Sequence, residues 1–252
     1  CVKIFVNEKE QPVRTQKDKG TIAVGGREMV LSKNMQKLVA GSSTIRKLFE
    51  EGIELAKEVG AENVYDFSLG NPAAPVPEEV KKSIYDILEN RNANFVHCYM
   101  PNAGYPEVRE KVAANLNKKY NSSFTKDDII MTVGAAGGIN CVLRSLLEPE
   151  DEVLCFAPFF GEYNSYVMNF GGNLKVVPAD YETFQLNVEE ADKYITERTK
   201  AVIINNPNNP SGVVYNKETL IRLQKMLEKA EERIGHPIYV LSDEPYRELV
   251  YD

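Results

Sequence analysis

The sequence predicts an α/β protein in which a mostly parallel sheet is covered by helices on both faces. Short runs rich in β-branched residues alternate with amphipathic runs from about residue 128 onward. Such alternation is typical of parallel strands joined by helical crossovers, which form three layers. Hydrophobic residues make up 43% of the 252 residues and charged residues 27%, so the chain can bury a sizeable core.

The first half of the chain is predicted to be mainly helical. A helix over 43–59 ends at Gly60, and a short strand over 64–69 leads into a proline-containing loop over 70–77. Pro77 is expected at the first position of the next helix. Four apolar side chains at helical spacing form the face that this helix is expected to bury: Val80, Ile84, Ile87 and Leu88.

The second half is predicted to alternate between helices and strands. A helix over 108–116 comes first. Strands are expected at 128–133, 152–156, 174–178, 200–205 and 238–243. Helices are expected at 139–147, 161–170 and 217–233.

Residues 1–28 differ from the rest of the chain. They hold six basic and four acidic residues, a net charge of +2, whereas the whole chain carries −7. They show no clear helical or strand periodicity after Phe5. We predict that 1–28 is an atypical, disordered extension of upstream or fused origin, with Met29 as the natural start. A native flexible tail is the alternative.

Composition excludes several classes of protein and site. The net charge of −7, from 30 basic and 37 acidic residues, argues against non-specific nucleic-acid binding. No apolar run approaches the roughly 20 residues of a membrane span. The four cysteines form no Cys-x-x-Cys pair, so no metal site is expected and a reducing compartment is favoured. The chain also shows no signal peptide at its start, and we therefore predict a cytoplasmic protein.

Ligands of open α/β sheets bind beyond the carboxyl ends of the strands, and two strand exits here are rich in small or aromatic residues. The segment 132–138 is mostly glycine and alanine and opens a helix, so its backbone N–H groups can approach an anion. The segment 157–163 places aromatic side chains after a strand, where they can face a planar ligand. Taken singly, each segment fits ordinary packing equally well.

Two further exits are polar. The loop 205–212 contains two Asn-Pro steps, so it is either an irregular turn or a rigid loop that presents side-chain amides. Asp243 ends an apolar strand, and Tyr246 follows three residues later. A carboxylate at such a place is costly to bury unless it is paired, so Asp243 is either solvated or faces a cationic partner.

Together these segments resemble the class I and II aminotransferases, which are fold-type I enzymes dependent on pyridoxal 5′-phosphate (PLP). The resemblance covers 29–252 and rests on motifs in the family's order. These are the loop Gly70-Asn71-Pro72 to Pro77, the run Tyr99 to Arg109, Gly134-Ala135-Ala136, Pro158-Phe159-Phe160, Asn209-Pro210-Ser211-Gly212 and Asp243-Glu244-Pro245-Tyr246. It implies that 29–76 is an N-terminal arm with part of a smaller domain. It also implies that 77–252 is a large PLP-binding domain truncated at its C-terminal end.

The resemblance implies cofactor-binding roles for the residues of the strand exits. Backbone N–H groups of Ala135 and Ala136 would hold the cofactor phosphate. Phe160 would stack on the pyridine ring. Asn209 and Tyr246 would form hydrogen bonds with the 3′-oxygen of the ring.

Three more residues match the family's pattern. Asp243 would pair with the ring nitrogen and favour its protonated form. Tyr99 would reach the phosphate of the cofactor in the neighbouring subunit, which implies a homodimer. Gly70 lies where the family's loop approaches the substrate carboxylate, a looser match.

The implied activity is transfer of an amino group from an α-amino acid to a 2-oxo acid by a ping-pong mechanism. In the family, a lysine forms a Schiff base with the cofactor and moves the α-proton, and it lies a few tens of residues beyond the Asp-x-x-Tyr motif. The chain ends at Asp252, and no upstream lysine matches. We therefore expect this segment to supply cofactor contacts without the catalytic lysine and to be inactive by itself.

Other functions share these motifs. A lyase, decarboxylase or synthase of the same fold type would bind the cofactor in the same way, because the protein selects which bond breaks. A non-catalytic truncated protein of this fold is another alternative. The effector domain of a transcription regulator is disfavoured, because 1–28 is too short for a DNA-binding domain. The sequence motifs do not indicate whether the substrate is an acidic, an aromatic or an aliphatic amino acid.

Overall fold

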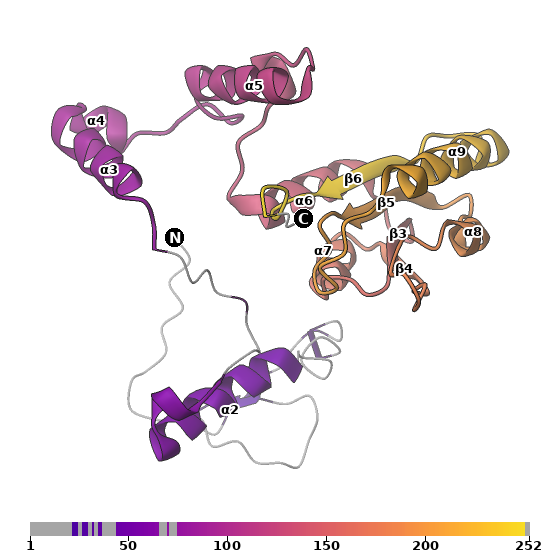
Figure 1. The fold of residues 1–252 in the computed structure, drawn as a ribbon, viewed down its shortest axis with the longest axis horizontal. Coiled ribbons are helices and arrows are strands. Elements are labelled where there is room, and N and C mark those ends of the chain that lie inside the picture. Colours follow the sequence, from indigo (N-terminus) through magenta and orange to yellow (C-terminus); the bar gives the residue numbers. More distant parts are fainter. Residues whose placement is uncertain are drawn as a thin grey trace. The chain divides into compact units, whose positions relative to one another are not determined.

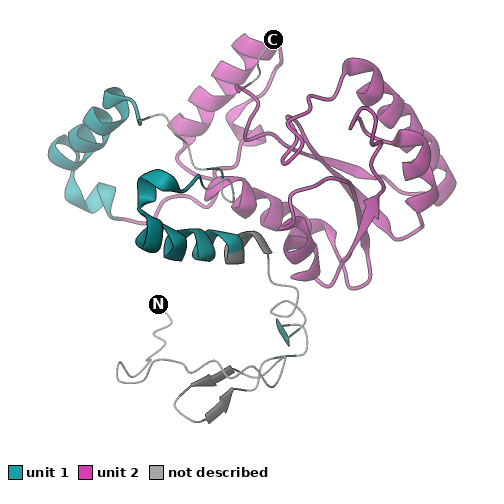
Figure 2. Cartoon of the chain, turned by 60° about the horizontal axis from the view of Figure 1, so that its bottom comes forward, with its two compact units in different colours: residues 1–97 teal, residues 98–252 magenta. Residues whose placement is uncertain are grey.

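The computed structural model describes residues 22–24, 27–29, 32, 35–36, 44–65, 70 and 75–249 (Figure 1). Two compact units cover 1–97 and 98–252, and each is described by itself (Figure 2). The boundaries at residues 28 and 76 stay predictions. No helix among the described residues is both long enough and apolar enough to cross a membrane.

The first unit begins with a small antiparallel pair that the sequence pattern does not predict. Strand β1 (Ile22–Val24) pairs with β2 (Arg27–Met29), so that Ile22 lies opposite Met29. The pair overlaps the predicted N-terminal extension, whose other residues lie outside the described part of the chain.

Helix α2 (Thr44–Val59) confirms the first predicted helix. Gly60 follows it with φ of 90°, a conformation that favours glycine, and the short 3-10 helix η1 (Ala61–Asn63) comes next. Most of the strand predicted at 64–69 lies outside the described residues.

Helix α3 (Glu78–Asn90) starts one residue later than predicted, and Pro77 precedes it instead of forming its first residue. The short helix α4 (Ala93–Val96) follows. The prediction of a buried face on α3 is wrong for the described structure, because Val80, Ile84, Ile87 and Leu88 are all exposed. Helical spacing of apolar residues shows that a face can be buried, but burial also needs a surface to cover it.

The second unit opens with α5 (Pro106–Tyr120), the 3-10 helix η2 (Lys126–Asp128) and α6 (Gly134–Leu146). The strand predicted at 128–133 is wrong, because this segment pairs with no strand among the described residues. Its backbone groups bond elsewhere. Met131 N–H donates to the Ala103 carbonyl at 2.9 Å, and Arg109 Nε donates to the Ile129 carbonyl at 2.7 Å.

The predicted sheet is present in the second unit, with four parallel strands in the order β4-β3-β5-β6 (Figure 1). The strands are β3 (Glu152–Phe156), β4 (Asn173–Val177), β5 (Thr199–Asn205) and β6 (Tyr239–Asp243). All four lie within a residue or so of their predicted ranges, and they have their carboxyl ends at one edge.

Helices cover the sheet on both faces. The predicted helices 161–170 and 217–233 are confirmed as α7 (Tyr163–Met168) and α9 (Lys217–Ile234), and a short α8 (Val188–Ala191) adds to them. The 3-10 helix η3 (Asp192–Tyr194) continues from α8.

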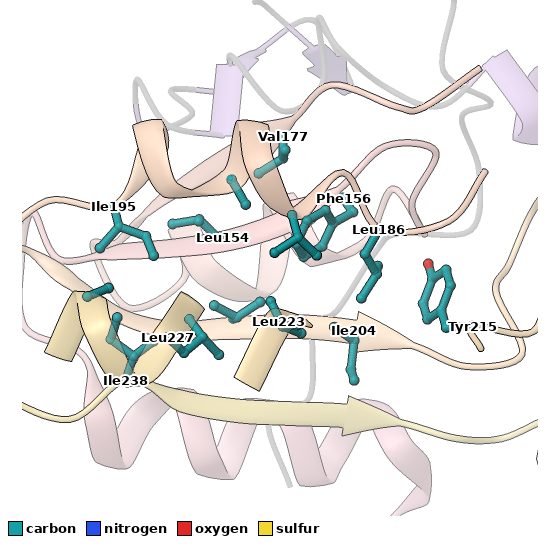
Figure 3. Packing of buried hydrophobic residues seen from close by; sticks show 14 residues of the cluster. Leu154, Phe156, Val177, Leu186, Ile195, Ile204, Tyr215, Leu223, Leu227 and Ile238 are labelled. Carbon is teal, nitrogen blue, oxygen red and sulfur yellow. The ribbon is translucent and has the colours of Figure 1, made fainter. Parts of the chain in front are cut away.

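Successive residues of β3 point to opposite faces, and this alternation divides the core in two. Leu154 and Phe156 pack with residues of α8 and α9, including Leu223 and Leu227 (Figure 3). Val153 and Cys155 pack with residues of α6 and α7 on the other face. β3 and β5 are buried almost throughout, and their carboxyl ends lie with that of β6 at one edge of the sheet, where ligands of such sheets bind.

Candidate functional site

A cavity of about 230 Å³ lies at the carboxyl ends of β5 and β6 and at the start of α6. Six of the eight site residues predicted from the sequence line it. Its lining consists of Ala135, Ala136, Ile139, Phe160, Tyr166, Asn205, Asn209, Asp243, Pro245 and Tyr246. A larger cavity of about 300 Å³ lies against α9 and is lined mainly by aliphatic side chains, without a converging set of polar groups. The smaller cavity is therefore the better candidate for chemistry.

Strand register brings the polar residues of the site together. Asn205 ends β5 and lies directly opposite Asp243, which ends β6. The Asn205 side-chain amide donates to the Asp243 backbone carbonyl at 2.8 Å, and the Asn206 N–H donates to the same oxygen at 3.2 Å. These two bonds fix the backbone of Asp243 at the edge of the cavity.

The Asp243 carboxylate has one engaged oxygen and one free oxygen. Tyr163 Oη donates to Asp243 Oδ2 at 2.6 Å. Asp243 Oδ1 is buried and has no hydrogen-bond partner among the described residues. Buried polar atoms are nearly always satisfied in proteins, so an acceptor left open beside a cavity fits a donor from a ligand.

Hydrogen bonds of both side chains and backbone hold the loop after β5. The Asn209 N–H donates to Asn205 Oδ1 at 2.5 Å, and the Gly212 N–H donates to the Asn208 carbonyl at 2.7 Å. Asn209 Nδ2 in turn donates to Tyr246 Oη at 3.0 Å. The rigid-loop interpretation of 205–212 is therefore supported, and Asn209 and Tyr246 lie side by side at the cavity.

Helix α6 presents its N-terminus to the cavity. It begins at Gly134, earlier than the predicted 139, because the small residues before Ile139 are themselves helical. Ala135 and Ala136 lie in its first turn, where backbone N–H groups have no partner within the helix. These N–H groups and the partial positive charge of the helix end favour an anion.

Phe160 supplies an aromatic wall. Its ring meets that of Tyr163 edge to face, with centroids 5.7 Å apart and planes at 83°. Tyr163 is almost completely buried, and burial raises the pKa of its phenol, with the Asp243 carboxylate raising it further. Tyr163 therefore stays protonated and acts as the donor in its bond to Asp243.

Two predicted site residues lie outside this cavity. Tyr99 is fully exposed in the second unit. Gly70 belongs to the first unit and is exposed. Their roles stay predictions.

Sequence reasoning missed residues that the structure places at the site. The sequence places Tyr163 and Tyr166 in an aromatic run and a predicted helix, and Asn205 at the start of a predicted loop, without marking any of them as a site residue. Asn205 could have been found from its place at the end of an apolar strand, as Asp243 was. The link from Tyr163 to Asp243 spans 80 residues of sequence and follows only from the fold.

Comparison with known proteins identifies the family. The family model for aminotransferase class I and II matches residues 61–252. The chain belongs to this family. The fold and the resemblance predicted from the sequence are thereby confirmed.

Two curated relatives illustrate the match. The chain is 36% identical over 227 residues to aromatic-amino-acid aminotransferase 2 of Thermococcus litoralis, covering 89% of the chain and 54% of that protein. It is 35% identical over 212 residues to an aspartate aminotransferase of Pyrococcus abyssi, covering 83% and 50%. The chain thus spans about half the length of the curated relatives it matches.

Solved structures agree with this assignment. An amino transferase from Eubacterium rectale superposes with a TM-score of 0.84 at 42% identity, covering 89% of the chain and 56% of that structure. Aspartate aminotransferase from Thermus thermophilus with maleate gives a TM-score of 0.75 at 30% identity, covering 89% and 55%. The α/β sheet with flanking helices is therefore the fold-type I arrangement predicted from the sequence.

Proposed function

We propose that the full-length protein is a PLP-dependent aminotransferase that moves an amino group from an α-amino acid to a 2-oxo acid. Family membership supports the reaction class. The observation that carries the proposal within the site is Oδ1 of Asp243, which is buried and has no partner in the described part of the chain, in a cavity with an aromatic wall and a helix N-terminus.

The described residues fit this cofactor. Asp243 Oδ1 would accept a hydrogen bond from the protonated ring nitrogen. Phe160 would offer its ring to one face of the pyridine, and Asn209 and Tyr246, already joined to each other, would contact the 3′-oxygen. The bound cofactor supplies an electron sink for the bond that breaks at the substrate α-carbon.

The start of α6 would hold the phosphate. Backbone N–H groups of Ala135 and Ala136 lie in the first turn of α6, where the helix offers them no acceptor, and the helix end favours a dianion. Thr132 Oγ1 is already engaged with the Gly134 carbonyl at 3.0 Å, which steadies the turn before them.

The lysine that forms the Schiff base is proposed to lie outside the 252 residues. None of the ten residues that line the cavity is a lysine. The lysine would bind the cofactor aldehyde and carry the α-proton, while the residues described here orient the ring and hold the charge.

The remaining features of the proposal concern the whole protein. We propose a cytoplasmic homodimer in which Tyr99 contacts the cofactor phosphate of the neighbouring subunit, and in which Gly70 approaches the substrate carboxylate. The exposure of Tyr99 on its own chain is compatible with such a contact.

Transamination by the full-length protein tests the proposal. A panel of acidic, aromatic and aliphatic amino acids is offered with 2-oxoglutarate and PLP, and formation of the new 2-oxo acid and of glutamate is followed. We expect Asp243→Ala to lower kcat about a hundredfold, because it removes the charge that favours the protonated ring nitrogen.

The matched control is Glu244→Gln. Glu244 adjoins Asp243 but accepts from Ser242 Oγ at 2.6 Å and lines no part of the cavity, so kcat should be unchanged. Release of ammonia or carbon dioxide without a new amino acid would replace the aminotransferase assignment by a lyase or a decarboxylase. Failure to bind PLP would remove the proposal altogether.

A further inference from the structure

Tyr163 contacts two parts of the site, although none of the roles above uses it. It lies in the first turn of α7 and is only 1% exposed. Its hydroxyl donates to Asp243 Oδ2 at 2.6 Å, and its ring packs edge to face against Phe160. One buried side chain thus contacts both the acidic partner and the aromatic wall of the cavity.

We infer that Tyr163 is a positioning residue for cofactor binding, which holds the Asp243 carboxylate in place through Oδ2 and leaves Oδ1 as the acceptor for a pyridine N–H. The inference rests on the proposed function, because the group it would serve is the ring nitrogen of PLP. In this role Tyr163 acts through Asp243 and does not itself contact the substrate.

The hydrogen bond to Oδ2 satisfies one oxygen of a carboxylate that lies at a partly buried place. Burial of a polar group is costly unless the group is hydrogen-bonded, so this bond stabilises the Asp243 side chain where it lies. The Tyr163 hydroxyl keeps its proton and remains the donor, because burial and the neighbouring carboxylate raise the pKa of its phenol above the usual value.

The same bond determines which oxygen is available. With Oδ2 engaged by Tyr163, Oδ1 is the oxygen of Asp243 that is buried without a partner among the described residues. The Asp243 backbone is already held by Asn205. Main chain and side chain are therefore fixed separately, as preorganised binding of a charged donor requires.

Tyr166 provides a matched control. It lies about one helical turn after Tyr163 in α7 and lines the same cavity. Its ring packs against that of Tyr163, with the centroids 6.4 Å apart. No described hydrogen bond joins its hydroxyl to Asp243. Removal of either hydroxyl keeps an aromatic ring in place, so the two variants differ mainly in the bond to Oδ2.

The test measures binding of two ligands to the full-length protein by calorimetry. One is pyridoxine 5′-phosphate, which lacks the aldehyde and so binds without a covalent bond. The other is its analogue with a carbon in place of the ring nitrogen. The ratio of the two dissociation constants reports the contact with the ring nitrogen and is insensitive to general loosening of the cavity.

We expect the wild-type protein to prefer the pyridine by about a hundredfold, and Tyr163→Phe to reduce this preference about tenfold, as loss of a hydrogen bond to a charged group does. Tyr166→Phe should change it by less than about twofold. Replacement of Tyr163 by 4-aminophenylalanine, which keeps a donor at the same place, should retain the preference.

Three outcomes would overturn the inference. If Tyr163→Phe weakens the binding of both ligands equally, Tyr163 has a packing role only. If Tyr166→Phe reduces the preference for the pyridine as much as Tyr163→Phe does, the bond to Oδ2 has no special role. Loss of the preference in a folded 4-aminophenylalanine variant would reject the donor argument even if Tyr163→Phe does not fold. A wild-type protein that binds neither ligand would instead reject the proposed function.

Discussion

Strands β5 and β6 are neighbours in one parallel sheet, and each ends in a polar residue of the candidate site, yet their surroundings differ. β5 pairs with strands on both sides, and its Val202 is completely buried. β6 pairs only with β5 among the described strands, and its Val240, which lies opposite Val202, is 49% exposed. The backbone hydrogen bonds to a single neighbouring strand therefore suffice to place a functional side chain. Burial of a strand, by contrast, needs neighbouring elements on both of its sides.

The largest expected effect concerns the buried strands at high pH. Burial raises the pKa of the Cys155 thiol from 9.0 to about 12. The stability that depends on the neutral thiol is therefore fully present below pH 9 and is lost as the pH rises toward 12. We expect the wild-type chain to lose about 3 kcal/mol more than Cys155→Ala between pH 9 and 12, at no more than about 1.4 kcal/mol per pH unit.

Urea unfolding at each pH measures this difference. Burial also raises the pKa of Tyr215 to about 12, so both chains should lose some stability above pH 10. Cys141→Ala, at an exposed cysteine, is the control. Parallel curves for the wild type and Cys155→Ala would show that β3 is open to solvent.

The second effect tests the comparison of strands directly. In the 252-residue chain, Val202→Ala should lower the free energy of unfolding by about 2 kcal/mol, because it removes buried methyl groups and leaves a cavity. Val240→Ala, the same change in the same row of the sheet, should cost less than about 1 kcal/mol. Equal losses would mean that the outer side of β6 is covered in solution.

The smallest effect concerns the tie between the loop after β5 and the turn after β6. Asn209 Nδ2 donates to Tyr246 Oη at 3.0 Å at a partly exposed place. A double-mutant cycle with Asn209→Ala and Tyr246→Phe should give a coupling free energy of about 0.5 kcal/mol in unfolding experiments. A coupling indistinguishable from zero would show that the two sides of the site move independently.

Much of the fold could be predicted from local patterns. The strands at 152–156 and 200–205 are apolar throughout, and helix 217–233 has a clear amphipathic period, so each element follows from its own residues. The strand predicted at 128–133 has suitable residues too, but a strand needs a partner, and pairing is a non-local property. The wrong prediction for the face of α3 has the same cause.

The candidate site, too, has residues that local sequence predicts and an arrangement that depends on non-local contacts. Asp243 could be found because a carboxylate at the end of an apolar strand stands out in the sequence, and Asn209 because its Asn-Pro-Ser-Gly run matches the family's motif. Their mutual arrangement could not be found, because it depends on the register that sets Asn205 opposite Asp243 and on the contact from α7. Tyr163 has no local signal of a site role, because a tyrosine among aromatic residues resembles ordinary core packing.

The register of β6 on β5 also determines which kinds of sequence change the site can tolerate. Adjacent residues of a strand point to opposite faces, so deletion of a single residue within β6 would bring Glu244 into the position of Asp243 or turn the carboxylate away from Tyr163. Val240 is exposed and accepts substitution, yet its removal would displace the acid at the strand's end. Variation by insertion or deletion is therefore confined to the loops, while β6 can change only residue for residue.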